Sequence, residues 1–375
     1  MKLVYLANIG LPAEWAHEIQ IMKMCEAFAL GGLEIELIVP RRRFFKTKEN
    51  IFIHYGIEEK FKIIKLPCLD ISPGSPNNFI FLIRLFSFLI FAKIYLIFKK
   101  YDILYTREHH VGFFFKKINL EIHSLPKKVK DWHKKIWRRA KNLIVLTSLI
   151  KNELVELGVP EEKILIAADA VDLKEFDIKI SKETARKKLS LPLDRKIIVY
   201  TGSFYLRDWK GINVLLDSVK YFSDDYLFVL IGGEEGEIDK IKISYPFDNI
   251  LLIPRRPHKE IPFYLEAADV LVLPNKKGEE ISEKYTSPMK MFEYMASGRP
   301  VVASSLLSIR EILSDNNAVL VEPNNPMALA EGIKKTLQNT ELSDKISKQS
   351  FYDVQNYTWG KRVEKIINFI QQKNA

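Results

Sequence analysis

One short stretch, SPMKMFE at residues 287–293, places a cation and a carboxylate close together at an expected helix start. Ser287 suits the N-cap and Pro288 the first helical position, and the free amide groups there attract an anion. Lys290 falls in the first turn, where a cation is unfavourable unless an anion offsets it. Glu293 follows one turn later, where a carboxylate can accept hydrogen bonds from the hydroxyls of a ribose. The residues alone indicate either a phosphate and ribose site or a Lys–Glu surface pair worth roughly 0.3 kcal/mol.

A second loop of this kind is YTGSFYLRDWKG at residues 200–211. Gly202 ends an apolar strand pattern, and a glycine there lets backbone amides approach a ligand closely. Lys210 precedes a helix pattern and adds a mobile charge suited to phosphate, and Arg207 could add another. The spacing by itself predicts either a phosphate-binding loop or a solvated turn.

Gly10, in ANIGLPAEWAHE at residues 7–18, is a third candidate, because it separates the first expected strand from the first expected helix. It could cradle a phosphate or leave room beside a bound substrate. Ligands of open α/β sheets lie beyond the carboxyl ends of strands, and all three loops follow apolar strand patterns. A single glycine turn is equally consistent with a plain connection.

The elements that must position these loops form an alternating α/β pattern. Apolar runs at 2–8 and 34–40 flank a helical pattern at 16–32, which makes one βαβ unit. The alternation restarts at 195–203 after a polar, lysine-rich segment within 170–190. Further strands are expected at 102–108, 120–124, 142–148, 226–233, 249–254, 269–275 and 299–304. Because 375 residues exceed one comfortable core, we expect two Rossmann-like domains.

The composition is that of an ordinary globular protein, with 47% hydrophobic and 28% charged residues. The net charge of +10 is uneven, because residues 1–180 hold 29 basic against 21 acidic residues. Such an excess indicates an anionic partner, such as a phosphate, an acidic glycan, a membrane surface or a nucleic acid. Two cysteines cannot build a disulfide framework, and MKLVYLANIG lacks the apolar core of a signal peptide, so we expect a cytoplasmic location.

Taken together, five stretches resemble a retaining GT-B glycosyltransferase of family 4, also called glycosyl transferases group 1. They are RAKNLIVLTSLIKNEL (139–154), VDLKEF (171–176), YTGSFYLRDWKG (200–211), IPFYLEAADVLVLPN (261–275) and SPMKMFEYMASGRPVVAS (287–304). The resemblance covers nearly the whole chain in the right order and is strongest over 139–310. Its motifs are specific for the family, but not for the donor or the acceptor.

The resemblance implies GT-B architecture, in which two Rossmann-like doubly wound domains face each other across a cleft. Residues 1–175 would form the acceptor-side domain, 190–357 would bind the nucleotide-sugar donor, and 358–375 would cross back to the first domain. The implied reaction moves a sugar from a nucleotide-diphosphate sugar to an acceptor hydroxyl with retention, in cell-envelope polysaccharide or glycolipid synthesis. Lysines, amides and a helix N-terminus would stabilise the leaving diphosphate, so no metal and no cofactor are expected.

The resemblance also assigns residues to this chemistry. Lys210 would contact the diphosphate, Glu293 the ribose, and His123 in LEIHS the transferred sugar, and these three form the expected catalytic set. A histidine at a strand end can equally be a hydrogen-bonded core residue. Pro257 lies in IPRRPH at 253–258, where main-chain groups would meet the base. The expected donor site consists of Gly10, Gly202, Ser203, Arg207, Lys210, Pro257, Ser287, Pro288, Met289, Lys290 and Glu293.

Two positions depart from the family pattern. Tyr285 stands where the first of two glutamates eight positions apart is usual, although Glu280 and Glu283 lie close by. Ser203 stands where an arginine often follows the strand glycine, which removes one phosphate charge unless Arg207 supplies it. The contacts to the sugar hydroxyls, and so the sugar itself, stay undetermined, while activity is still expected.

Two segments of the basic half bear on the acceptor. NNFIFLIRLFSFLIFAKIYLIFKK (77–100) is apolar, but its longest uncharged run, 85–92, is far short of a membrane span. KKVKDWHKKIWRRAK (127–141) holds eight basic residues, two tryptophans and one acid, which suits an anionic membrane interface. A buried helix and a solvated amphipathic helix are the plain alternatives. We predict peripheral contact with the cytoplasmic face of the membrane through 79–100 and 127–141, and a glycan or lipid-linked acceptor.

Three other functions fit parts of the sequence. A nucleotide-sugar epimerase on the same scaffold would need an acid/base pair in the cleft, and no such pair can be assigned. A non-catalytic partner subunit of a glycosyltransferase complex is suggested by Tyr285 and Ser203 and would bind donor weakly. A nucleic-acid-binding protein would need aromatic platforms along a basic groove, and the basic residues cluster in one segment, so no nucleic-acid partner is expected.

Overall fold

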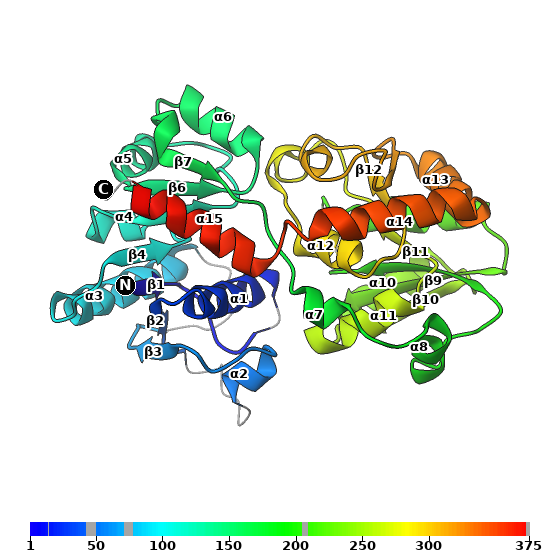
Figure 1. Cartoon of the computed structure of the whole chain (residues 1–375), viewed down its shortest axis with the longest axis horizontal. Coiled ribbons are helices and arrows are strands. Elements are labelled where there is room, and N and C mark those ends of the chain that lie inside the picture. The colour runs from blue at the N-terminus through cyan, green and yellow to red at the C-terminus, as the bar shows by residue number, and fades with distance from the viewer. Residues whose placement is uncertain (14, 43–49, 71–77, 205–208, 373–375) are drawn as a thin grey trace. The chain divides into compact units, whose positions relative to one another are not determined.

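The computed structural model divides the chain into two compact units (Figure 1). Unit 1 consists of Met1–Ala168 and Trp359–Ala375, and unit 2 consists of Asp169–Thr358. Residues 169–175 thus pack with unit 2, where the backbone N–H of Val171 donates to the carbonyl of Tyr357 at 2.9 Å. The structure describes residues 1–13, 15–42, 50–70, 78–204 and 209–372.

Unit 1 is built on a parallel sheet with seven strands among the described residues, in the order β3-β2-β1-β4-β5-β6-β7. The strands are β1 (Lys2–Leu6), β2 (Glu34–Pro40), β3 (Lys62–Leu66), β4 (Ile103–Thr106), β5 (Asn119–Ile122), β6 (Asn142–Val145) and β7 (Ile164–Ile166). The helices are α1 (Ala16–Leu30), α2 (Ile51–His54), α3 (Asn78–Ile97), α4 (Val111–Phe114), α5 (Asp131–Arg139), α6 (Ser148–Glu156) and α15 (Trp359–Gln372), with a 3-10 turn at Glu161–Lys163. The last helix, α15, packs against α1, so the two ends of unit 1 lie side by side (Figure 1).

Unit 2 repeats this plan with six strands in its described part, in the order β10-β9-β8-β11-β12-β13, all parallel. The strands are β8 (Lys196–Thr201), β9 (Tyr226–Gly233), β10 (Ile250–Pro254), β11 (Val270–Leu273), β12 (Val301–Ser304) and β13 (Val319–Val321). The α-helices are α7 (Leu173–Phe176), α8 (Lys182–Lys188), α9 (Ile212–Ser218), α10 (Glu235–Ser244), α11 (Ile261–Ala267), α12 (Met289–Ala296), α13 (Pro326–Gln338) and α14 (Thr340–Val354). Short 3-10 turns at Val219–Tyr221, His258–Glu260 and Ile309–Glu311 and a π-helical turn at Ile281–Tyr285 complete it.

The central strands are buried apolar runs because helices cover both faces of a parallel sheet. In β8, for example, every residue after Lys196 is buried. The strand order reverses between β1 and β4 in unit 1 and between β8 and β11 in unit 2. Connections leave in opposite directions at such a point, which opens a crevice beyond the carboxyl ends of the strands. The loops after β1, β8 and β11 begin at these two points, as the sequence predicts.

The apolar segment 77–100 contributes α3 to unit 1. By length and composition alone, Phe79–Ile97 could cross a membrane. The sequence-based expectation of a shorter segment counted only the uncharged run 85–92. One side of α3 is nevertheless part of the core, because Leu85, Phe88, Leu89 and Ala92 have no exposed surface. The helix is therefore anchored in unit 1 along one side.

Candidate functional site

The carboxyl end of β8 turns at Gly202, which has a φ of 133°. This left-handed backbone favours glycine. A Cβ atom at this position would also lie 3.0 Å from Nζ of Lys290 and 3.2 Å from the hydroxyl of Tyr200. The glycine therefore lets the Lys290 ammonium approach the loop closely.

Two predicted lysines meet at this turn. Nζ of Lys290 donates to the carbonyl of Thr201 at 3.0 Å and lies 4.2 Å from the centroid of the Tyr200 ring. Nζ of Lys210 donates to the hydroxyl of Ser203. Two ammonium groups at one turn repel each other, and a bound anion would relieve that repulsion. The third predicted cation, Arg207, lies outside the described residues.

A glycine also places Lys210 at the switch point of the sheet. Gly211 precedes α9 with a φ of 72°, and a Cβ atom there would lie only 1.9 Å from the carbonyl oxygen of Pro274. The backbone N–H of Lys276 donates to the carbonyl of Trp209 at 2.8 Å. The loop that carries Lys210 is thereby fastened to the segment that follows β11.

The start of α12 differs from the prediction. The helix begins at Met289, Pro288 is its extended N-cap residue, and no side-chain hydrogen bond caps it. Ser287 is not the N-cap, because its hydroxyl accepts a hydrogen bond from the backbone N–H of Asp169 at 3.1 Å. The helix is held to the turn after β8 by Tyr294, whose hydroxyl accepts from the N–H of Thr201 at 2.8 Å.

Glu293 is buried on α12 and forms part of a carboxylate–histidine–carboxylate chain. Nε2 of His258 lies 2.9 Å from Glu293, and Nδ1 of the same ring lies 2.9 Å from Glu175 on α7. Burial by itself would lower the pKa of His258, but the two carboxylates outweigh it and raise the pKa to about 10. The ring is therefore an imidazolium at neutral pH that fixes Glu293. Pro257 directly precedes it, so the predicted base-contacting segment adjoins the predicted ribose carboxylate.

The residues near the missing first glutamate have structural partners. Tyr285 is buried at the end of the π-helical turn. Glu283 accepts a hydrogen bond from the N–H of Gly278 at 2.6 Å, and Glu280 forms an ion pair of 3.0 Å with Lys284. Both carboxylates that could stand in for the first glutamate thus contribute to the fold of this loop.

In unit 1, His123 lies just after β5 with about one fifth of its side chain exposed. Its Nδ1 atom is 2.8 Å from Nη2 of Arg107, and its Nε2 atom is 2.5 Å from the carboxylate of Glu121. Because a guanidinium only donates, Nδ1 must accept and Nε2 must carry the proton. His123 is therefore a neutral ring of fixed tautomer and orientation.

Glu121 is the buried centre of this network. It meets Nη2 of Arg362 at 2.9 Å, accepts from Nε2 of Gln20 at 2.8 Å and also accepts from the hydroxyl of Tyr105. Burial favours the neutral acid, but the charge of Arg362 and the hydrogen bond from His123 hold the pKa of Glu121 well below its usual range. Arg362 comes from α15, so the last helix of the chain supports the orientation of His123.

Most of the predicted site residues that the structure describes lie in unit 2, and Gly10 and His123 lie in unit 1. Lys290, Gly202, Ser203 and Lys210 share one turn of unit 2, and Glu293 lies one helical turn beyond Lys290 on α12. Ser287, Pro288 and Met289 form the entry to α12, and Pro257 adjoins His258. Gly10 is buried in the loop after β1, and His123 follows β5, both in unit 1.

Sequence reasoning missed the groups that hold the predicted residues. These are Glu175, His258 and Tyr294 in unit 2 and Gln20, Tyr105, Arg107, Glu121 and Arg362 in unit 1. The histidine in IPRRPH, directly after Pro257, was an available signal. Glu121, two residues before His123 in LEIHS, was another, while the remaining groups lie at least 16 residues from their partners.

The chain is similar in sequence to a family model and to glycosyltransferases of several organisms. The family model for glycosyl transferases group 1 matches residues 181–351. D-inositol 3-phosphate glycosyltransferase of Xylanimonas cellulosilytica is 26% identical over 50% of this chain and 46% of its own length. An uncharacterized glycosyltransferase of Methanocaldococcus jannaschii is 22% identical over 87% and 86% of the two chains. A putative colanic acid biosynthesis glycosyltransferase of Escherichia coli is 25% identical over 53% and 48%. The chain thus spans about half the length of two of these relatives.

Solved structures share the whole fold at low identity. Sucrose-phosphate synthase from Thermosynechococcus elongatus superposes with a TM-score of 0.80 at 20% identity, covering 100% of this chain and 99% of the other. HepE of Anabaena, in complex with UDP-glucose, superposes with a TM-score of 0.77 at 14% identity over 99% and 100%. The predicted α/β fold of two doubly wound sheets is confirmed by these matches together with the strand orders of both units.

Proposed function

We propose that the chain transfers a sugar from a nucleotide-diphosphate sugar to an acceptor hydroxyl. The proposal is supported by the match of residues 181–351 to the family model for glycosyl transferases group 1 and by the GT-B fold that the chain shares with solved structures. The observation that carries this proposal is the meeting of Lys210 and Lys290 at the Gly202–Ser203 turn. That turn follows β8 at the switch point of the sheet, where α/β proteins bind nucleotides. Glu293, one helical turn beyond Lys290, is suited to the ribose hydroxyls.

The main catalytic task is to stabilise the charge that develops on the leaving diphosphate. Lys210 and Lys290 supply two positive charges at the place where that charge would form. The N–H groups at the start of α12 add donors, because no side chain caps this helix. We therefore propose that transfer proceeds without a metal ion.

We further propose that the configuration at the anomeric carbon is retained. The bond from that carbon to the diphosphate oxygen breaks first, and its electron pair goes to the leaving phosphate. The acceptor oxygen then attacks the same face of the oxocarbenium-like centre, and its proton passes to the leaving phosphate oxygen. Both ring nitrogens of His123 are already hydrogen bonded to Arg107 and Glu121, so the ring is suited to packing against the transferred sugar rather than to proton transfer.

We also propose a nucleotide, a class of acceptor and a cellular location. UDP is our first choice of nucleotide, since the structure of similar fold from Anabaena was solved with UDP-glucose. An acceptor in polysaccharide or glycolipid synthesis fits the printed role of the relative from Escherichia coli. A cytoplasmic location suits the two cysteines, both of which are free thiols.

Calorimetric titration of UDP, GDP and ADP tests the donor site. We expect one nucleotide to bind, and both Lys210→Ala and Glu293→Ala to weaken that binding by at least about tenfold. Lys240→Ala and Glu235→Ala, on exposed positions of α10, are matched controls that should bind like the wild type. If no nucleotide binds, or if the site variants match their controls, the proposed site is wrong.

A non-catalytic partner subunit is the second candidate function. It is favoured by Tyr285, which is buried where the family has a sugar-contacting glutamate. An assay for release of nucleoside diphosphate from UDP-glucose and related donors distinguishes a glycosyltransferase from a non-catalytic partner subunit. A protein that binds the nucleotide yet neither transfers nor hydrolyses any donor would support the partner-subunit function.

A further inference from the structure

α3 carries an exposed apolar side opposite the side that is anchored in the core. Ile90, Ile94 and Ile97 recur at helical spacing with about half or more of their surface exposed, and Ile97 reaches 66%. Phe98, just after the helix, is 81% exposed. Exposed aliphatic and aromatic side chains in one row are unusual on a soluble surface and indicate an interaction site.

This apolar row continues beyond α3. One turn before Ile90, the ring of Phe86 lies 6.2 Å from that of Phe113 on α4, which is itself half exposed. The ring of Phe113 lies 5.1 Å from that of Trp132 on α5. The three helices follow one another along one side of unit 1 (Figure 1). We name the surface formed by α3, Phe113 and Trp132 the α3–α5 surface.

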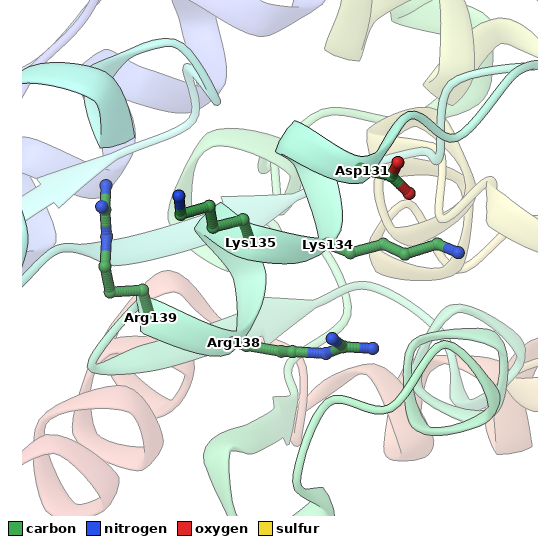
Figure 2. Close-up of a pocket in the computed structure, with 5 residues that line it drawn as sticks. All are labelled: Asp131, Lys134, Lys135, Arg138 and Arg139. Carbon is green, nitrogen blue, oxygen red and sulfur yellow. The ribbon is translucent and has the colours of Figure 1, made fainter.

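The α5 end of this surface is strongly basic. Asp131, Lys134, Lys135, Arg138 and Arg139 line a pocket on α5. Figure 2 shows Lys135 and Arg139 projecting on one side of the helix and Lys134 and Arg138 on the other. At the other end, Lys99 and Lys100 are exposed directly after Phe98. Residues 78–100 contain no acidic residue.

We propose that the α3–α5 surface binds the face of an anionic lipid bilayer, with the apolar row in the interface and the α5 cations on the headgroups. Apolar side chains flanked by Lys, Arg and Trp are the composition that interfacial helices share. Charge complementarity selects this occupant, because basic residues border the apolar row at both ends.

Crossing the bilayer is incompatible with the packing of α3, even though its length and composition would allow it. A spanning helix would have to withdraw Leu85, Phe88 and Leu89 from the core of unit 1. The charged residues of α3 also contact unit 1. Arg84 lies 3.7 Å from Asp70, and Nζ of Lys93 lies 4.7 Å from the centroid of the Phe115 ring. α3 thus lies on the membrane rather than through it.

This proposal is independent of the donor site. It concerns unit 1 only and would hold whether or not the chain binds a nucleotide. If both proposals hold, the protein works at the membrane surface, where lipid-linked acceptors are found.

Co-sedimentation of the full chain with vesicles tests the proposal. We expect binding to vesicles of phosphatidylcholine mixed with phosphatidylglycerol, and much weaker binding to phosphatidylcholine alone. Ile94→Glu with Ile97→Glu, and separately Lys134→Glu with Lys135→Glu, should each weaken binding by at least about tenfold. Added salt should weaken the wild type as well, because exposed charges are screened.

Matched controls come from elsewhere in the chain. Ile53→Glu replaces an isoleucine on α2 that is 64% exposed, and Lys240→Glu with Lys242→Glu repeats the charge change on α10. Both should bind vesicles like the wild type. Circular dichroism verifies folding, and Phe98→Glu, outside the helix, is a second probe if the α3 pair destabilises unit 1.

Three results would overturn the proposal. One is a wild type that stays in the supernatant with anionic vesicles. Another is vesicle binding that the α3 and α5 variants leave unchanged. The third is a dimer in analytical ultracentrifugation that the α3 pair dissociates, without vesicle binding, which would make the surface a contact between two copies.

Discussion

The basic side chains at the ends of the two sheets meet different partners. In unit 2, Lys210 and Lys290 donate to neutral oxygens of the turn after β8. In unit 1, Arg362 meets the fully buried carboxylate of Glu121. A neutral oxygen offsets only part of the hydration that an ammonium loses, whereas a carboxylate compensates a buried guanidinium. The unit 2 lysines lie at the turn where we propose that the diphosphate binds, while Arg362 serves the fold and the orientation of His123.

The largest effect is expected from removing the arginine of the buried pair. Arg362→Met should destabilise unit 1 by about 3–5 kcal/mol, because it leaves the Glu121 charge buried without its main partner. Urea unfolding followed by circular dichroism measures this loss. Lys361→Met, at the exposed neighbouring position, should change stability by less than about 0.5 kcal/mol. If Arg362→Met and Lys361→Met were equally stable, the Glu121–Arg362 pair would not stabilise unit 1.

Lys290→Met tests the other half of the comparison. We expect nucleotide affinity to fall by about 2 kcal/mol, because a charged hydrogen bond to the diphosphate is lost. The stability of unit 2 without ligand should change by less than about 1 kcal/mol, since the lysine is only partly buried and a hydrogen bond to a carbonyl contributes little net stability. Calorimetry measures the nucleotide affinity, and urea unfolding measures the stability. A large loss of stability with unchanged affinity would instead make Lys290 a structural residue.

The smallest effect concerns the pH dependence that His258, the histidine paired with Glu293, gives to the stability of unit 2. Its pKa is raised to about 10, so its stabilisation is full below the unfolded pKa of about 6.5 and is lost as pH rises towards 10. Between about pH 6.5 and about pH 8 alone, the wild type should lose on the order of 1–2 kcal/mol beyond any loss in His258→Gln, at about 1.4 kcal/mol per pH unit. Urea midpoints between pH 6 and about 10 check this difference. Parallel slopes for His258→Gln and the wild type would contradict the assignment of the raised pKa to His258.

Strand prediction succeeded in the middle of each sheet but found only one of the four edge strands, β10, predicted at 249–254. The predicted runs at 34–40 and 226–233 coincide with β2 and β9, whose residues are mostly buried. The strands that the sequence did not reveal are β3, β7 and β13, and all three lie at an edge of a sheet. Edge strands are short and tolerate charged residues, as in KIIKL of β3, so the apolar signal is weak there.

Only those features of the candidate site that depend on local sequence signals were predicted. The glycine turn after β8 and the lysines beside it were visible because strand, turn and helix signals are local. Ser287 was assigned a local role as N-cap, but its hydroxyl serves Asp169, 118 residues away. A side chain with two available partners takes the one that the fold brings near, which a local pattern does not reveal.

The sequence by itself determined the alternation of strands and helices, the two α/β units and the loops that carry lysine, glycine and glutamate. Those features depend on periodicity and turn chemistry, which act over a few residues. Only the tertiary structure decided which charges are compensated. Glu121 and Arg362 are 241 residues apart, and His258 and Glu293 are 35 apart. Whether a charge stabilises the fold or is suited to a ligand depends on partners that only folding brings into contact.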